Sequence, residues 1–345
     1  MDIVVAGGGI IGLATAWRLA QRGLRVAVWE AGRVGGEASW AGAGMLAPGG
    51  ELDARNWWSD LAIESLREYP EFVRELEQEA GIPIDFRACG ALEYAFNETE
   101  WLQLTERART QREWGIRSQQ AGDGRMFYPD DSAVDPRDVV ECLRICCARS
   151  GVTLREEQPV REIRVEQGRI AAPECAAAAV VAAGAWSSGI AIRVEGTLLP
   201  LEPSVPVRGH LISFAAGAAP PGPIVRHGHT YILERSNGLT IAGSTTERVG
   251  FDRNPDPAQV NGIGIRAAQL MPRLKGMAVT AAWVGFRPGT ESGDPQLGRL
   301  ADTPVFLAYG HYRNGILMAP ASARRLTREI TASSQTDSFL QAGHR

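Results

Sequence analysis

The start of the chain passes from a short apolar run to apolar residues at helical spacing, and back to an apolar run. Ile3–Ala6 is apolar and rich in β-branched residues, which is typical of a buried strand. Positions 10–22 have the spacing of a helix that ends at Gly23, and Arg25–Trp29 follows as a second strand. The pattern therefore predicts a strand–helix–strand unit.

Four longer segments have the pattern of helices. Ser59–Ala80 is amphipathic and is followed by Gly81, a residue that commonly ends helices. Asp135–Ser150 begins with Asp-Pro, which places an N-cap residue before a proline in the first helical position. Glu98–Trp114 and Pro257–Met271 complete the predicted long helices.

The remaining apolar runs predict strands. Ala178–Ala183 reads as a buried strand that could join the sheet beginning at Ile3. Consecutive strands of an antiparallel sheet are expected over Leu198–Phe214, Ile224–Glu234 and Leu239–Gly243. Further strands are predicted at Gly90–Phe96, Val152–Glu156, Val160–Val165, Met277–Arg287 and Val305–Tyr309, and the last leads through a turn into a helix over Ile316–Ile330.

The segment Glu37–Gly50 (EASWAGAGMLAPGG) does not fit either pattern. Its side chains are small, so we expect a loop that contributes little to the core. Small residues would let the backbone lie against a flat ligand.

This order of elements predicts an α/β fold. It is of the α+β two-domain type, because a parallel Rossmann-like sheet and an antiparallel sheet would form separate domains. We expect a discontinuous, Rossmann-like cofactor-binding domain over 1–88, 135–200 and 288–345. A substrate-binding domain with an antiparallel sheet, over 89–134 and 201–287, would be interleaved with it.

Composition excludes several partner classes. With 345 residues, 44% hydrophobic and 22% charged, the chain has the make-up of a globular protein. The net charge of −4 and the lack of a basic block argue against nucleic acid or an anionic membrane as partners. The longest apolar candidate, Ala176–Gly184, is much shorter than the ~18 residues of a membrane span. The N-terminus leads directly into a strand, so we expect no signal peptide and a cytoplasmic location.

The five cysteines do not have the spacing of a disulfide framework or a zinc site. They are Cys89, Cys142, Cys146, Cys147 and Cys175. We expect buried free thiols, which suit a reducing compartment.

The turn after the first strand carries the strongest chemical signal. Gly7, Gly9 and Gly12 fit G-x-G-x-x-G: the first allows a tight turn, the second a close approach to a pyrophosphate, and the third close helix–strand packing. The pyrophosphate would lie at the N-terminus of the helix, on its free N–H groups. Glu30 ends the second strand, where an acidic residue would bind the adenosine ribose. The unit predicts a site for an adenine dinucleotide.

Other glycine-rich features are dispersed along the chain, at Ala41–Met45, Ala183–Gly184 and Gly310–Gly315. A nicotinamide dehydrogenase usually has a contiguous nucleotide-binding half. Scattered close approaches of the backbone suit a larger cofactor that runs through the fold, so FAD is favoured over NAD.

These motifs resemble the D-amino acid oxidase/glycine oxidase superfamily of FAD-dependent amine oxidases, and most of all the glycine oxidases of thiazole (thiamine) biosynthesis. The similarity covers nearly the whole chain. VVAGGGIIGLATAWRLA is shared by many flavoproteins, and SWAGAGMLAP is more specific. The most specific segments are HGHTYILERSNGLTIAGSTTERVGFD, WVGFRPGTESGDPQLGR and YGHYRNGILMAP.

The resemblance implies which residues contact FAD. Sarcosine oxidases bind their flavin covalently through a cysteine near their C-terminal third. This chain has no cysteine beyond Cys175, so the FAD is expected to be non-covalent. The implied cofactor-binding residues, together with the glycines of the motif, are Ile10, Ile11, Glu30, Ala31, Ala38, Ser39, Ala43, Gly44, Met45, Val160, Ala183, Gly184, His311, Tyr312, Arg313, Asn314, Gly315, Ile316 and Leu317.

The resemblance also implies that Arg287 binds the substrate carboxylate, with Tyr231 and Arg313 beside it. Arg287 stands in Phe-Arg-Pro-Gly at a strand end, where a guanidinium can form two parallel bonds to a carboxylate. Arg313 could equally form a structural ion pair. Met45 and Thr246 are expected in the pocket wall, and relatives carry a bulkier apolar residue in place of Thr246.

The implied reaction is oxidative deamination of glycine or another small amino acid, with hydride transfer to FAD and reoxidation by O2 to give H2O2 and an imine or 2-oxo acid. An oxidase of sarcosine, small D-amino acids or larger N-substituted amino acids remains an alternative. So does a dehydrogenase with another electron acceptor, and a non-catalytic FAD-binding subunit of an amine dehydrogenase complex. The resemblance also implies a homo-oligomer, with the tetramer as the form that the family suggests.

Overall fold

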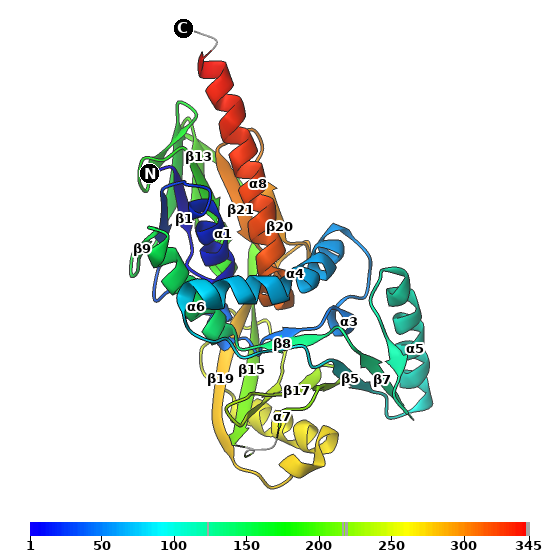
Figure 1. Cartoon of the computed structure of the whole chain (residues 1–345). Helices are drawn as coiled ribbons and strands as arrows, with labels where there is room; N and C mark the ends of the chain where they lie inside the picture. Colours follow the sequence, from blue (N-terminus) through cyan, green and yellow to red (C-terminus); the bar gives the residue numbers. More distant parts are fainter. Residues whose placement is uncertain (123, 216, 218–219, 343–345) are drawn as a thin grey trace.

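The computed structural model describes residues 1–345 apart from 123, 216, 218, 219 and 343–345. In Figure 1, the upper part holds a parallel sheet with helices α1 and α8, and the lower part holds a large sheet with helix α7. The two long strands β15 and β19 run side by side through the lower part.

The upper sheet has six strands in the order β20-β21-β12-β1-β2-β9. Its neighbours are parallel except β20 and β21. The join predicted for the Ala178 segment is confirmed, because β12 pairs directly with β1. The strands are β1 (Ile3–Ala6), β2 (Val26–Trp29), β9 (Thr153–Arg155), β12 (Ala178–Val181), β20 (Gln296–Arg299) and β21 (Val305–Tyr309).

Strand β1 is buried on both faces, which explains its unbroken apolar run. Ile3 and Val5 pack toward the helices, and Val4 and Ala6 pack toward a four-stranded sheet. The helices are α1 (Ile10–Ala20), α4 (Trp57–Ala80), α6 (Pro136–Arg149) and α8 (Gly315–Ala342). The four-stranded sheet contains β10 (Glu162–Glu166), β11 (Arg169–Ala172), β13 (Ala191–Val194) and β14 (Thr197–Leu199).

The lower sheet has eight strands in the order β19-β15-β18-β17-β16-β5-β7-β6. All neighbours are antiparallel except β16 and β5. The antiparallel sheet predicted within 198–243 is present, but two of its predicted strands are wrong. Residues 197–199 form β14 of the four-stranded sheet, and residues 224–234 form two strands, joined by a turn, where one was predicted. The strands are β5 (Ala91–Tyr94), β6 (Gln119–Gln120), β7 (Arg125–Tyr128), β15 (Ser204–Ala215), β16 (Ile224–His227), β17 (Thr230–Glu234), β18 (Leu239–Gly243) and β19 (Val279–Thr290).

The alternation of side chains in the lower sheet decides which residues face the upper part. Ile212 and Ile232 pack in the cluster with helix α7 (Pro257–Leu270). Their neighbours Leu211 and Tyr231 belong to the cluster on the opposite face. Tyr231 therefore points away from α7.

The prediction of a loop over 37–50 is wrong. This segment forms α2 (Ala38–Ala41), β3 (Met45–Leu46) and α3 (Pro48–Glu51). A Cβ added to Gly42 would lie 2.5 Å from the side chain of Ile316, and one added to Gly44 would lie 1.8 Å from the carbonyl oxygen of Val134. The small residues therefore allow close packing of the backbone, and most of the segment is buried.

Strand β3 belongs to a three-stranded sheet in the order β3-β8-β4. The remaining elements are β4 (Phe86–Arg87), α5 (Glu98–Glu113), β8 (Ser132–Val134) and the 3-10 helices η1 (Gly184–Gly189), η2 (Pro272–Leu274) and η3 (Tyr312–Asn314).

Cys142, Cys146 and Cys147 are buried free thiols, as predicted. Burial raises the pKa of both Cys142 and Cys146 to about 12. Cys175, in contrast, is exposed, because it lies in the turn that follows β11. None of the described helices has the length and hydrophobicity required to cross a bilayer.

Candidate active site

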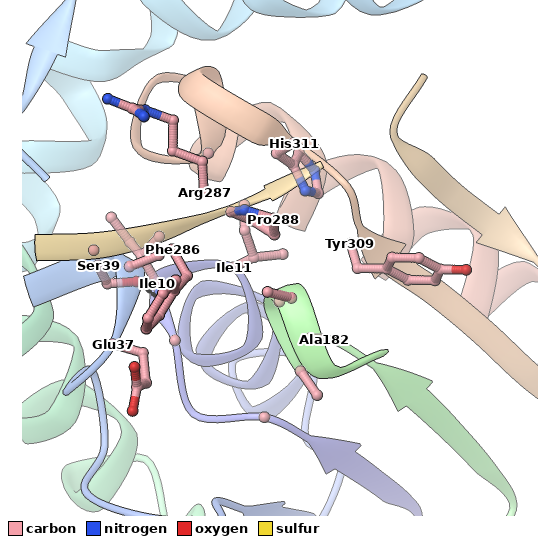
Figure 2. Close-up of a pocket in the computed structure, with 18 of the residues that line it drawn as sticks. Ile10, Ile11, Glu37, Ser39, Ala182, Phe286, Arg287, Pro288, Tyr309 and His311 are labelled. Atoms are coloured by element: carbon pink, nitrogen blue, oxygen red, sulfur yellow. Dashed lines mark hydrogen bonds between the residues drawn. The ribbon is translucent and has the colours of Figure 1, made fainter. Parts of the chain in front are cut away.

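A large pocket lies between the upper and lower sheets. It begins at the carboxyl ends of the parallel strands β1, β2, β12 and β21, where ligands of open α/β sheets commonly bind. It continues to strands β15, β17 and β19 of the lower sheet. In Figure 2, Ile10 and Ile11 lie at the start of α1, and Arg287 and Glu37 lie on opposite sides of β19.

The glycine turn forms the floor at one end of this pocket. Gly7 and Gly9 line it, and helix α1 begins immediately after them without a side-chain cap at Gly9. Ser39 accepts a hydrogen bond of 3.0 Å from the backbone N–H of Ile10. Ser39 therefore takes one N–H group of this helix N-terminus, and the positive end of the helix dipole at the pocket is suited to bind a phosphate.

The three glycines of the motif have different surroundings. Gly7 has a φ of 114°, and a Cβ there would lie 2.3 Å from the carbonyl oxygen of Ala182. A Cβ at Gly12 would lie 2.0 Å from the carbonyl oxygen of Gly7, so Gly12 serves close packing inside the protein. A Cβ at Gly9 would meet only the Ser39 hydroxyl, at 3.3 Å. Gly9 is therefore the glycine that keeps space open in the pocket.

Glu30 has a contact that the motif does not predict. Its carboxylate accepts hydrogen bonds from the backbone N–H groups of Gly8, at 2.7 Å, and Gly32, at 2.9 Å. Glu30 also lines the pocket. It holds the glycine turn in shape, while its predicted bond to a ribose stays a prediction.

Arg287 is a cation of the lower sheet that lines the pocket. Its guanidinium donates to the carbonyl oxygen of Thr245, at 3.0 Å, and to the hydroxyl of Ser244, at 2.7 Å. Within the described part of the chain, no carboxylate forms an ion pair with it. Burial lowers the pKa of Arg287, and the nearby charge of Arg313 acts in the same direction. The charge of Arg287 is thus available to an anion in the pocket.

Tyr231 and Arg313 line the pocket together with Arg287. Burial raises the pKa of Tyr231, so its hydroxyl remains protonated and can donate to an anion. Arg313 makes two bonds to Glu51, at 2.6 and 2.9 Å. The ion pair considered for Arg313 from the sequence is present, and it lies in the pocket wall.

Most of the predicted site residues line this pocket. They are Gly7, Gly9, Ile10, Ile11, Glu30, Ala31, Ala38, Ser39, Ala43, Gly44, Met45, Val160, Ala183, Gly184, Tyr231, Arg287, His311, Tyr312, Arg313, Gly315 and Ile316. Gly12, Asn314 and Leu317 are buried behind the wall. Thr246 is exposed and lies outside the lining, because its neighbours Ser244 and Thr245 turn toward Arg287 instead. The geometry thus gives Thr246 no place in the pocket wall.

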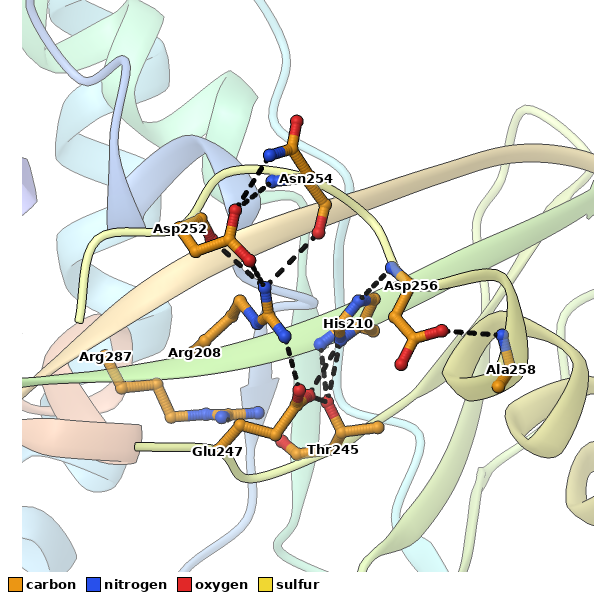
Figure 3. Close-up of polar contacts among 9 residues, drawn as sticks. All are labelled: Arg208, His210, Thr245, Glu247, Asp252, Asn254, Asp256, Ala258 and Arg287. Carbon is orange, nitrogen blue, oxygen red and sulfur yellow. Dashed lines mark hydrogen bonds and ion pairs between the residues drawn. The ribbon is translucent and has the colours of Figure 1, made fainter. Parts of the chain in front are cut away.

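A polar network behind Arg287 was not predicted from the sequence (Figure 3). Thr245 donates to Glu247 at 2.5 Å and accepts from the backbone N–H of His210 at 3.0 Å. Glu247 also accepts from Arg208, at 2.6 Å, and pairs with Nδ1 of His210, at 2.9 Å. Since Nε2 of His210 accepts from the N–H of Asp256, its Nδ1 carries the proton toward Glu247. The network fixes the segment to which Arg287 is bonded.

If Arg287 binds a carboxylate as predicted, the network should contribute to that binding by positioning the segment at 244–245. Replacing Thr245 by the isosteric Val removes the hydroxyl that links Glu247 and His210. Two hydrogen bonds are lost, each worth about 1 kcal/mol, so we expect the KM of the predicted carboxylate substrate to rise by up to about 30-fold with little change in kcat. Steady-state kinetics check this. An unchanged KM with a lowered melting temperature would show that the network serves stability only.

Residues 2–329 match the family model described as FAD dependent oxidoreductase. The chain belongs to the FAD-dependent oxidoreductase family. The α/β fold and the FAD cofactor predicted from the sequence are confirmed by this membership.

Individual relatives extend the comparison. The chain is 35% identical over 339 residues to the bifunctional protein ThiO/ThiG of Synechocystis sp.. This alignment covers 93% of this chain and 50% of the relative. It therefore spans about half of that bifunctional protein. It is 30% identical to the glycine oxidase of Bacillus subtilis, covering 99% of this chain and 96% of the relative. The crystal structure of glycine oxidase from Geobacillus kaustophilus superposes with a TM-score of 0.89 at 29% identity, covering 96% of this chain and 94% of that one.

Proposed function

We propose that this member of the FAD-dependent oxidoreductase family oxidises glycine or another small amino acid, with O2 as electron acceptor. The observation that carries the proposal is Arg287, a desolvated cation in the pocket whose own hydrogen bonds run to neutral acceptors. Such a group is suited to bind a carboxylate. The full-length similarity to glycine oxidases supports glycine as the first candidate.

The residues present fit FAD. The space kept open at Gly9, the start of α1 and the small side chains of Ala38, Ser39 and Ala43 all line this end of the pocket. These residues would hold the diphosphate and the path toward the flavin, and the segment His311–Ile316 would hold the flavin end. Bound there, FAD would supply the redox chemistry, as acceptor of the substrate hydride and donor of two electrons to O2, with H2O2 as the product.

The chain itself binds and orients the substrate. Arg287 and Tyr231 would hold the carboxylate and so fix the position of Cα, which lowers the entropic barrier of the reaction. The amine must lose its proton before a hydride can leave. The imine product is then hydrolysed by water, which converts glycine into glyoxylate and ammonia.

The pH dependence follows from which groups titrate. His311 is fully enclosed, and burial lowers its pKa to about 4, so its imidazole is neutral above about pH 5 and does not titrate in the working range. We therefore expect kcat/KM for glycine to rise from pH 6 to 9 with a slope of up to about tenfold per unit, as the substrate amine deprotonates. Initial rates across this range check it, and a flat profile would contradict oxidation of the free amine.

The substrate is best identified by mixing the FAD-loaded protein anaerobically with a panel of amines and following the loss of flavin absorbance. Glycine should reduce the flavin, and air should then restore it with release of H2O2. Faster reduction by sarcosine, a small D-amino acid or a larger N-substituted amino acid would select that alternative. Reduction without peroxide formation in air would indicate another electron acceptor. No reduction by any amine would favour a non-catalytic subunit.

Further parts of the proposal concern the setting of the enzyme. The similarity to the bifunctional protein ThiO/ThiG supports a place in thiamine thiazole synthesis. A cytoplasmic location and a homotetramer stay predictions, as does the division into an FAD-binding domain and a substrate-binding domain. The last three residues of the predicted segment 288–345 lie outside the described residues.

A further inference from the structure

We propose that Glu51 neutralises Arg313 and thereby restricts the site to substrates with a single carboxylate. This inference rests on the proposed function of the same pocket. It assigns to Glu51 a role in specificity that the sequence did not indicate.

The Glu51–Arg313 pair has the geometry of a strong ion pair. Nε and Nη2 of Arg313 donate to the two carboxylate oxygens of Glu51, at 2.6 and 2.9 Å, so the bonds are parallel and bidentate. The side chains are 17% and 12% exposed, and both residues line the pocket. A pair this enclosed is weakly screened by solvent.

Arg287 and Arg313 therefore differ in charge compensation. Burial alone would lower the pKa of Arg313, but the Glu51 carboxylate outweighs it and raises that pKa above the usual value. The pKa of Arg287 shifts downward, because burial is not offset by a bonded carboxylate. Of the two guanidinium groups near Tyr231, one is already paired and the other is free to receive an anion.

The charge balance at this end of the pocket selects the ligand. Two guanidinium groups and one carboxylate leave a net charge of one positive unit around Tyr231. An amino acid with a neutral amine carries one negative charge, which matches it. A second carboxylate on the substrate would meet Arg313 already bonded, and would be repelled by Glu51.

Glu51 is also held in place from behind. The buried side-chain amide of Gln111 donates two hydrogen bonds to the backbone at α3. The acceptors are the carbonyl oxygens of Gly49, at 3.0 Å, and of Leu52, which directly follows α3, at 2.7 Å. A Cβ at Gly50 would lie 2.5 Å from the guanidinium carbon of Arg226, so this side of α3 is closely packed. The backbone of α3 is thus fixed at the position from which the Glu51 side chain reaches Arg313.

The test is a ratio of affinities for two anions that are not oxidised. Acetate and malonate are titrated into the FAD-loaded protein, and binding is followed by the perturbation of flavin absorbance. The native chain should prefer acetate. In Glu51→Gln the freed Arg313 should shift the preference toward malonate by about tenfold or more, the effect of one additional ion interaction in a partly screened site. Glu75→Gln, which breaks the Arg18–Glu75 ion pair outside the pocket, is the matched control and should keep the native ratio.

Two further variants complete the charge argument. Glu51→Asp keeps the negative charge and should keep the acetate preference. The double variant Glu51→Gln, Arg313→Gln returns the net charge to one positive unit, and should return the ratio toward the native value. The proposal is overturned if Glu51→Gln keeps the native ratio, or if the double variant keeps the malonate gain.

A variant that fails to fold does not end the test. Arg313→Gln alone leaves Glu51 uncompensated beside Arg287 and should weaken acetate binding at least about tenfold, whereas unchanged acetate binding would overturn the proposal. Because neither anion is a substrate, these results are independent of turnover. Failure of the native chain to oxidise glycine would refute the proposed function while leaving the affinity ratio as measured.

Discussion

Arg287→Ala should lose most of its activity on glycine while keeping bound flavin. Removing one partner of a buried, hydrogen-bonded charge pair costs about 2–5 kcal/mol. At about 1.4 kcal/mol per tenfold, kcat/KM should fall about 30- to 4,000-fold. The flavin spectrum should persist, because the predicted diphosphate contacts lie at the other end of the pocket, around Gly9.

The variant Arg287→Lys is the control for this prediction. In Arg287→Lys the charge remains, but one ammonium cannot reproduce the two parallel donors of a guanidinium. Lysine should therefore recover little of the lost activity. Normal glycine oxidation by Arg287→Ala would show that the carboxylate is held elsewhere, with Arg313 as the next candidate.

The measurement also separates binding from folding. Arg287 bonds to Thr245 and Ser244, so its loss could loosen that segment. Exogenous guanidinium should restore part of the activity of Arg287→Ala if the vacated space is intact. If Arg287→Ala melts close to the temperature of the native chain, the loss of activity is due to the missing guanidinium and not to unfolding.

The strand, glycine turn and helix at one end of the pocket could be predicted from the sequence because their determinants are local. Gly7, Gly9 and Gly12 stand next to the strand and helix that they connect, and their spacing encodes the turn. The periodicity of β1 and α1 likewise depends on near neighbours. The segment 37–50 was misjudged for the opposite reason, since its burial depends on distant partners such as Val134 and Ile316.

The polar contacts around Arg287 and Arg313, the proposed substrate-binding residues, were beyond prediction from one sequence. Glu51 and Arg313 are separated by 262 positions, and Thr245 and Arg287 by 42. Nothing in local spacing brings such residues together. The one available signal for Glu51 was an isolated acid at the end of a stretch of small residues, which alone does not identify its partner.

Gly9→Ala should give a folded protein that binds FAD weakly. The backbone of Gly9 has a φ of −73°, which alanine adopts without strain, and the added methyl group would meet only the Ser39 hydroxyl, at 3.3 Å. The methyl group would instead enter the space proposed for the pyrophosphate. Overpacking of this size costs about 1–3 kcal/mol, so the Kd of FAD should rise about 5- to 150-fold.

Gly12→Ala provides the contrast, because it acts on the fold. A methyl group there would lie 2.0 Å from the carbonyl oxygen of Gly7, where neither backbone can yield without separating α1 from β1. The apoprotein of Gly12→Ala should therefore lose thermal stability, whereas that of Gly9→Ala should melt close to the native temperature. Isothermal titration with FAD and melting of the apoproteins measure the two effects separately. Native FAD affinity in Gly9→Ala would mean that the pyrophosphate does not approach this turn, and the proposed course of the cofactor through the pocket would have to be abandoned.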